Sequence, residues 1–213
     1  FTDRGQTLFA VVHGSQPKYT IPEILQDVER ATRFVRAHAA EYGVDPNRLG
    51  ITGGSAGGHL SLMQGARGRD GDPKAKDPVD RQSSRVQAVA CFFPPVDFLN
   101  YGKPGQWVLD LPFFEPFRPA FPKAETPAER EGMLRQMSPI TFVTAAMPPT
   151  LVIHGDADQL VPLQQAQLLM KRLEELGVPH RLVVREGKGH GWPEMGNDIP
   201  LLVDWFEEHL GKK

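Results

Sequence analysis

Several features that would point to other protein classes are scarce or absent in this sequence. The single cysteine, Cys91, excludes a disulfide within the chain and a zinc cluster built on cysteines. No apolar run approaches the length that a membrane-spanning helix needs. The formal net charge of -2 at pH 7 gives no electrostatic reason to expect binding to nucleic acid or to an acidic membrane surface. We find no internal repeat and no low-complexity tract.

The start of the chain also lacks expected signals. Residues 1–5 contain no initiator methionine, and no basic segment followed by the apolar core of a signal peptide is present. We expect the sequence to be the interior of a longer reading frame, and it gives no localisation. Its 213 residues, 40% hydrophobic and 23% charged, suit one globular domain with a substantial core. We therefore treat residues 1–213 as a single domain.

Strand and helix patterns alternate along the chain. A capping box at Thr20 and Glu23 opens the clearest amphipathic helix, and the segment after Ser55 is compatible with a second helix. Such alternation predicts an α/β fold, a mostly parallel sheet covered by helices on both faces. Apolar runs of strand length occupy residues 7–13, 49–52, 86–93, 150–154 and 181–185, and the later helices are expected at 127–137, 163–176 and 199–210.

The periodicity is lost between residues 94 and 149. Prolines and aromatic residues crowd this segment, and only residues 127–137 form a helical pattern. A connection this long is usually functional. We interpret it as an insertion over the carboxyl edge of the sheet, acting as a lid or pocket wall. Its aromatic residues would also serve as a small satellite core, and the two interpretations are compatible.

The pattern Gly-x-Ser-x-Gly at residues 53–57 directly follows a predicted strand and precedes a predicted helix. This context is typical of a nucleophile elbow, in which Ser55 stands exposed at the amino end of a helix. The turn is so sharp that we expect side chains at Gly53 and Gly57 to collide with neighbouring backbone. The alternative is an ordinary glycine-rich turn that happens to contain a serine.

A serine nucleophile needs a base and a carboxylate that orients the base. Asp158 follows the fourth predicted strand, and His190, flanked by glycines, follows the fifth. The alternative for Asp158 is an ordinary Asx-turn or helix cap. We expect Asp156 to hold the turn by accepting local N–H groups. His59 is expected to pack beneath the elbow, and His154 to be a buried residue with its hydrogen bonds satisfied.

These motifs resemble the esterase and lipase branch of the α/β-hydrolases, close to acetyl-esterases and hormone-sensitive-lipase-like enzymes and related to the carboxyl domains of prolyl-oligopeptidases. The resemblance implies Ser55 as nucleophile, Asp158 as acid and His190 as base, with the Ala56 N–H as an oxyanion donor. It implies no metal and no organic cofactor. It rests on Asp-Pro-Asn-Arg at 45–48, Gly-Gly-Ser-Ala-Gly-Gly-His at 53–59, His-Gly-Asp-Ala-Asp at 154–158 and Gly-His-Gly at 189–191.

The chain departs from this family at its amino end, where family members have further strands and a His-Gly-Gly loop that supplies the other oxyanion donors. One hypothesis is that another chain supplies those strands, or that they are absent and activity is reduced. The exposed sheet edge would then pair with another chain, as in a homo-oligomer. The second hypothesis places residues 7–13 beside 49–52, so that His13, Gly14 and Ser15 replace the missing loop.

The predicted function is hydrolysis of small-molecule carboxylic esters through an acyl-enzyme, and the resemblance implies short- to medium-chain acyl or acetyl groups. We expect neither a nucleic-acid partner nor a membrane-spanning segment. Two alternatives stay open. A peptidase of the prolyl-oligopeptidase kind would use the same three residues, and a non-catalytic domain would keep the fold and bind a partner.

Overall fold

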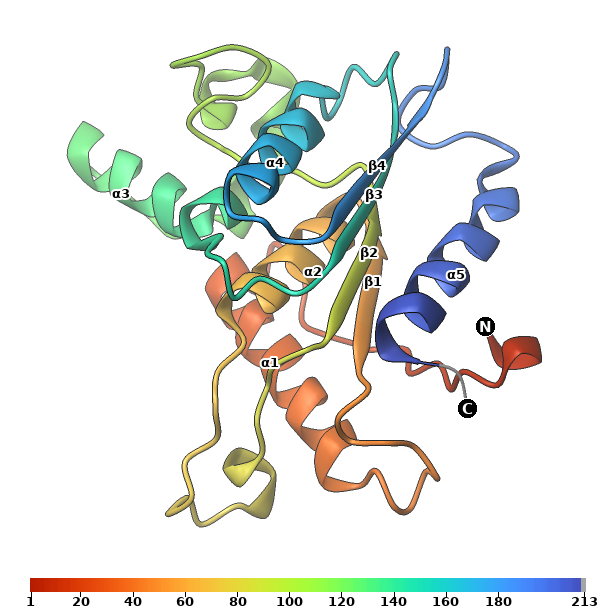
Figure 1. Ribbon diagram of the computed structural model, residues 1–213. Coiled ribbons are helices and arrows are strands. Elements are labelled where there is room, and N and C mark those ends of the chain that lie inside the picture. Colours follow the sequence, from red (N-terminus) through yellow and green to blue (C-terminus); the bar gives the residue numbers. More distant parts are fainter. Residues whose placement is uncertain (212–213) are drawn as a thin grey trace.

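A computed structural model describes residues 1–211, and within them four strands form one parallel sheet. The strands lie in chain order, from β1 at one edge to β4 at the other (Figure 1). Because all four run in the same direction, their carboxyl ends and the loops that follow share one edge of the sheet. The strands are β1 (Gly50–Gly54), β2 (Ala88–Phe92), β3 (Thr150–Gly155) and β4 (His180–Arg185).

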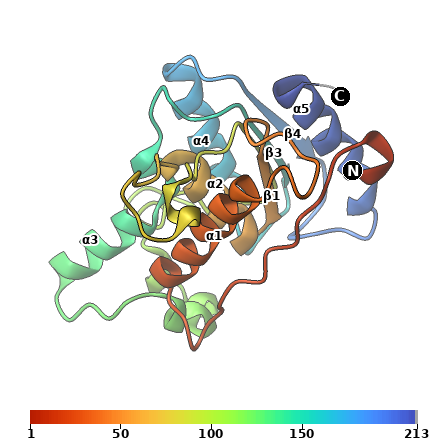
Figure 2. The same cartoon turned by 90° about the horizontal axis from the view of Figure 1, so that it is seen from below.

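Helices cover both faces of the sheet, which confirms the predicted α/β class (Figures 1 and 2). Alternate residues of β2 point to opposite faces: Cys91 packs with one set of helices and Ala90 with the other. On the first face lie α1 (Ile21–Ala37), α2 (Ala56–Arg67) and α4 (Gln164–Glu175), and on the second lies α5 (Ile199–Leu210).

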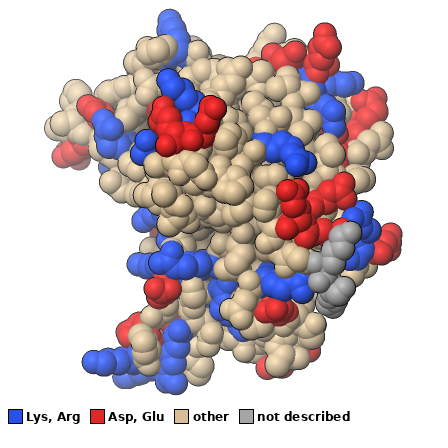
Figure 3. Space-filling view, viewed as in Figure 1, with Lys and Arg blue, Asp and Glu red and all other residues tan. Residues whose placement is uncertain are grey.

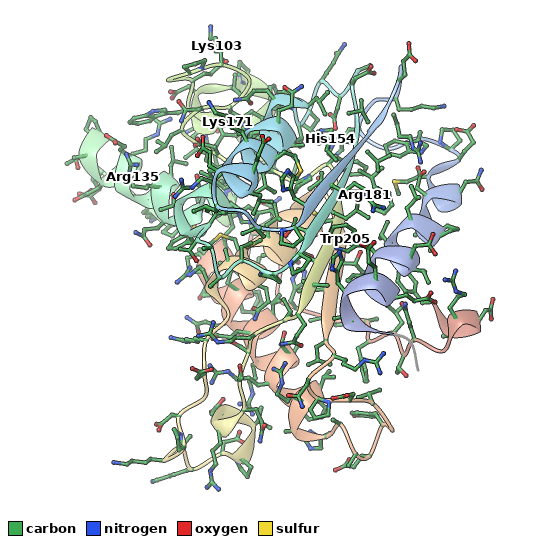
Figure 4. The ribbon with its side chains drawn as sticks, in the orientation of Figure 1. Lys103, Arg135, His154, Lys171, Arg181 and Trp205 are labelled. Atoms are coloured by element: carbon green, nitrogen blue, oxygen red, sulfur yellow. The ribbon has the colours of Figure 1, made fainter. Side chains whose placement is uncertain are left out.

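On the α5 face, Trp205 packs against β2 and β3 within a cluster of buried apolar side chains. The guanidinium of Arg181 on β4 lies 5.3 Å from the centre of the Trp205 ring, and Figure 4 shows the two side chains facing one another. On the face seen in Figure 3, basic and acidic side chains are interspersed, in keeping with the small net charge. No helix of residues 1–211 is long and apolar enough to cross a membrane.

The segment between β2 and β3 has its own core, as one of the two interpretations predicted. It contains short 3₁₀ turns and α3 (Pro127–Met137), which begins at a capping box between Thr126 and Glu129. Phe98, Phe114 and Phe121 pack together with the fully buried Tyr101. The Tyr101 hydroxyl donates to the Leu160 carbonyl (3.0 Å) in the loop after β3. This bond joins the segment to the carboxyl edge of the sheet.

The prediction of a strand at residues 7–13 is wrong. The segment is extended but pairs with no strand, and Leu8 and Val12 are 58% and 97% exposed. Its two ends are held by helices on opposite sides of the sheet. Arg4 binds Asp204 on α5 (3.1 Å), and the Gly14 N–H donates to Asp27 on α1 (2.9 Å).

The segment therefore crosses beyond β1 without reaching the strand's hydrogen-bonding edge (Figure 2). A hollow of about 810 Å³ lies there, lined by residues of the segment, β1, α1, α2 and α5. An apolar run has strand propensity, but it becomes a strand only when a partner satisfies its backbone groups. Among the described residues, β1 keeps one unpaired edge.

Candidate active site

Ser55 occupies the sharp turn between β1 and α2. Its φ of 54° lies in a region that side chains rarely adopt, as a nucleophile elbow requires. A Cβ at Gly53 would lie 2.5 Å from the backbone of Gly57, so only glycine fits there. The Ser55 N–H donates to the Phe92 carbonyl at the end of β2 (3.0 Å). The turn is thus fixed by close backbone packing on the β2 side.

The predicted clash at Gly57 is wrong. A Cβ built there meets nothing within 4 Å, and Gly57 lines the hollow beside β1. The crowded neighbour is Gly58, whose Cβ would lie 2.9 Å from the Phe92 carbonyl oxygen. The sequence pattern names Gly53 and Gly57 together, but only the packed structure shows which glycine faces backbone and which faces open space.

The structure brings Ser55, His190 and Asp158 into one line of hydrogen bonds. The distance from His190 Nε2 to Ser55 Oγ is 2.8 Å, and that from His190 Nδ1 to Asp158 Oδ2 is also 2.8 Å. A carboxylate only accepts hydrogen bonds, so Nδ1 carries the proton. The lone pair of Nε2 is then free to accept the proton of the Ser55 hydroxyl.

Asp158 is held as an ionised, fully buried acceptor. Its Oδ1 accepts the N–H groups of Leu160 and Val161 (both 2.9 Å), so the Asx-turn interpretation also holds. Burial alone would raise the pKa of the Asp158 carboxyl, but the nearby His154 imidazole and hydrogen bonds from His190 and the Val161 N–H bring it well below its usual range. The carboxylate therefore stays charged beside the imidazole.

Asp156 differs from its expected role. Instead of bonding N–H groups of its own turn, its Oδ1 accepts the N–H of Gly187, in the loop after β4 (2.6 Å). The Ala157 N–H donates to the Lys188 carbonyl (3.0 Å), and a Cβ at Gly155 would overlap that same carbonyl oxygen. The loops that carry Asp158 and His190 are therefore packed backbone to backbone.

Phe93 is a site residue that the sequence reasoning missed. It directly follows β2, has a φ of 35°, and places its ring 4.5 Å from the imidazole of His190. Its N–H donates to the Ile153 carbonyl of β3 (2.9 Å). Its position directly after a strand, next to two prolines, could have marked Phe93 as a residue at the carboxyl edge of the sheet. The sequence alone does not show where its ring points.

Two further histidines lie close to the site and are buried. His59 on α2 donates from Nε2 to the Met137 carbonyl (2.7 Å), and burial lowers its pKa to about 4. His154 on β3, labelled in Figure 4, donates from Nε2 to the Val161 carbonyl (2.8 Å). His154 is buried, as predicted. Its hydrogen bonds are not all satisfied, however, because its Nδ1 has no partner.

The second hypothesis for the oxyanion donors is wrong. It required a strand at residues 7–13 beside β1, and the structure has none. The Gly14 N–H is taken by the Asp27 carboxylate. Ala56 is the first residue of α2, where N–H groups lack partners within the helix. In the part of the chain described, no cluster of three or more histidine, cysteine, aspartate or glutamate side chains is arranged to hold a metal ion.

The chain is similar in sequence to proteins named as ester hydrolases. The chain is 36% identical over 172 residues to the probable carboxylic ester hydrolase LipM of Mycobacterium tuberculosis (strain ATCC 25618 / H37Rv), a match that covers 81% of this chain and 38% of LipM. The chain thus spans well under half the length of that relative.

Solved structures match most of the chain. A truncated form of a carbohydrate esterase from gut microbiota superimposes with a TM-score of 0.75 and 30% identity, covering 94% of this chain and 73% of that one. An acetyl ester-xyloside bifunctional hydrolase from Caldicellulosiruptor lactoaceticus superimposes with a TM-score of 0.73 and 27% identity, and the match covers 93% of this chain and 67% of that one. Both likenesses confirm the α/β-hydrolase fold of the described sheet and helices. The model of the BD-FAE family matches residues 1–173, and the chain therefore belongs to this family.

Proposed function

We propose that this site hydrolyses carboxylic esters through an acyl-enzyme. The observation that carries the proposal is the unbroken line from Ser55 Oγ through the His190 imidazole to Asp158, with 2.8 Å at each step. Ser55 is the nucleophile, His190 the general base and Asp158 the residue that fixes the imidazole tautomer.

The reaction follows from these positions. His190 Nε2 takes the hydroxyl proton as Ser55 Oγ bonds to the acyl carbon, and the same proton then passes to the leaving alcohol as the ester bond breaks. A water molecule repeats the sequence on the acyl-enzyme and releases the acid. The Ala56 N–H, at the positive end of the α2 dipole, stabilises the negative charge on the carbonyl oxygen.

Small-molecule esters with acetyl or short- to medium-chain acyl groups are the proposed substrates. The names of the similar solved structures, a carbohydrate esterase and an acetyl ester-xyloside hydrolase, support this class. The segment 94–149, anchored by Tyr101 to the loop after β3, serves as a wall or lid of the substrate site.

We also propose that the open edge of β1 pairs with another chain, as in a homo-oligomer. The unpaired edge and the hollow beside it support this pairing. Further oxyanion donors would then come from the pairing segment, since one lost donor costs about 10²–10³ in turnover. A monomeric mass at micromolar concentration, measured by light scattering, would contradict the pairing.

The test of the main proposal is turnover of p-nitrophenyl acetate by this chain and by its Ser55→Ala variant. We expect turnover in the first and none above background in the second. Labelling by a fluorophosphonate should follow the same pattern. Faster release from an aminoacyl p-nitroanilide would favour a peptidase, and an unreactive Ser55 would favour a non-catalytic binding domain.

A further inference from the structure

One buried carboxylate joins three points of the loop that carries His190. This loop leaves β4 at Arg185 and ends at Asp198, the residue before α5. Asp198 Oδ1 accepts a hydrogen bond from Arg185 Nη2, and its Oδ2 accepts the indole N–H of Trp192 (3.1 Å). The start of the loop, its end and the residue two positions beyond His190 therefore meet at one side chain.

The burial of Asp198 makes this arrangement specific. The residue is only 5% exposed, so its charge needs partners inside the protein. Arg185 supplies the opposite charge and Trp192 a second donor, and the two bonds occupy different oxygens. With both oxygens engaged, the carboxylate fixes the position of the indole ring as well as balancing the charge.

The indole ring in turn supports the imidazole through Phe93. The Trp192 ring lies 6.0 Å from the Phe93 ring at an interplanar angle of 71°, the edge-on geometry that aromatic pairs favour. The Phe93 ring lies 4.5 Å from the His190 ring. A line of contacts thus runs from Asp198 to Trp192, Phe93 and finally His190.

The two halves of the loop are secured in different ways. Before His190, Gly187 and Lys188 are bonded to the loop after β3. After His190, the part-buried Trp192–Asp198 hydrogen bond is the side-chain tie, since the Lys188–Glu194 ion pair is exposed and contributes little. Glycines on both sides of His190 give the backbone freedom that these ties must restrict.

We propose that Asp198, with Trp192 and Arg185, positions His190 for proton transfer. None of the three touches the reacting atoms, so they are positioning residues. The inference rests on the proposed role of His190 as the general base. It assigns to Asp198 the task of keeping Nε2 at hydrogen-bonding distance from Ser55 Oγ while Nδ1 faces Asp158.

The kinetic test compares Trp192→Phe, Asp198→Asn and the control Asp204→Asn. Trp192→Phe keeps an aromatic ring but removes the N–H donor, and Asp198→Asn removes the charge that Arg185 needs. We expect kcat for p-nitrophenyl acetate to fall about 10- to 100-fold in both, with KM near the starting value, because a shift of about 1 Å in a catalytic group costs up to 10²-fold. Asp204→Asn, on the exposed face of α5, should keep both constants.

A second readout does not depend on turnover. In protein labelled with ¹⁵N-histidine, the Nδ1 and Nε2 shifts of His190, assigned by their loss in His190→Gln, report its tautomer and hydrogen bonds. We expect these shifts to change in Trp192→Phe and to stay unchanged in Asp204→Asn. An unchanged kcat together with unchanged shifts in Trp192→Phe would overturn the inference, even if Asp198→Asn fails to fold.

The two proposals fail in different ways. If the unaltered chain hydrolyses no ester, the proposed function is wrong, and the ¹⁵N shifts still decide whether Trp192 and Asp198 position the imidazole. If the unaltered chain turns over ester and Trp192→Phe does so equally well with unchanged shifts, only the positioning inference is wrong.

Discussion

On one side of Ser55 the chain ties each loop to its neighbour, and on the other side, beyond β1, it leaves the edge of the sheet open. The loops after β3 and β4 share backbone hydrogen bonds and hold Asp158 and His190 in line with the serine. Beyond β1 lie a hollow and an unpaired, exposed segment. The proton-transfer half of the proposed machinery is therefore built within the described residues, whereas the oxyanion donor proposed there is an N–H group at the start of α2.

The largest expected effect on kcat comes from the loops after β3 and β4, which hydrogen bonds hold together. Asp158→Asn should lower kcat for p-nitrophenyl acetate about 10⁴-fold, because an amide at this position favours the wrong imidazole tautomer. The matched control is Asp156→Asn, whose amide oxygen still accepts the Gly187 N–H. Steady-state kinetics of both variants give the measurement. Equal losses in the two would mean that loop packing, rather than the charge beside His190, sets the rate.

A pair of glycine substitutions compares the two sides directly. Gly53→Ala should lower the free energy of unfolding by about 3 kcal/mol, because its Cβ meets the Gly57 backbone. Gly57→Ala should instead raise it by about 0.5–1 kcal/mol, since alanine favours the helix and the space is open. Urea unfolding of both variants measures these changes. A destabilised Gly57→Ala would indicate that another segment fills the hollow in solution.

The buried His59 predicts a loss of stability in acid. Its folded pKa, lowered to about 4 by burial, lies below the ordinary 6.5, so the unfolded chain takes up the proton first. The contribution of the neutral His59 to the free energy of unfolding is complete above pH 6.5, and it should fall by about 3 kcal/mol as the pH is lowered to 4. Urea unfolding of the unaltered chain and of His59→Gln across this pH range isolates the part of the free energy of unfolding that comes from His59. Parallel pH profiles in the two would contradict the assignment.

The smallest effect on stability and turnover is expected in the segment beyond β1. Asp27→Asn weakens the bond that holds Gly14, at the surface and away from the serine. The free energy of unfolding should change by about 0.5 kcal/mol or less, with kcat unchanged within about twofold. Thermal unfolding and ester kinetics provide the check. A large loss of kcat would mean that residues 7–15 contribute to the site in a way that the geometry does not show.

Local patterns allowed much of the fold to be predicted. The helices at 127–137 and 199–210 have the observed bounds, since capping residues, prolines and amphipathic spacing act within a few neighbouring positions. The four observed strands lie within two residues of their predicted ends. The order of serine, aspartate and histidine after successive strands also predicted which three side chains would meet, because parallel strands end at one edge.

What could not be predicted depends on partners far away in the chain. Residues 7–13 have the composition of a strand but lie beyond the reach of β1. Asp156 bonds a loop 31 residues further along rather than its own turn. Phe93 contacts His190, and Asp198 bonds Trp192, only because β2 and the start of α5 lie beside the loop that carries His190.

The sequence by itself determined the four strands of the sheet, the later helices, the elbow and the identity of the three aligned residues, since these follow from local backbone preferences and from the order of the chain. Only the tertiary structure decided which glycine needs its small size, which carboxylates tie the loops together and that residues 7–13 leave the outer edge of β1 unpaired. Those outcomes depend on close packing and on the pairing of backbone groups across the fold, and no local pattern encodes them.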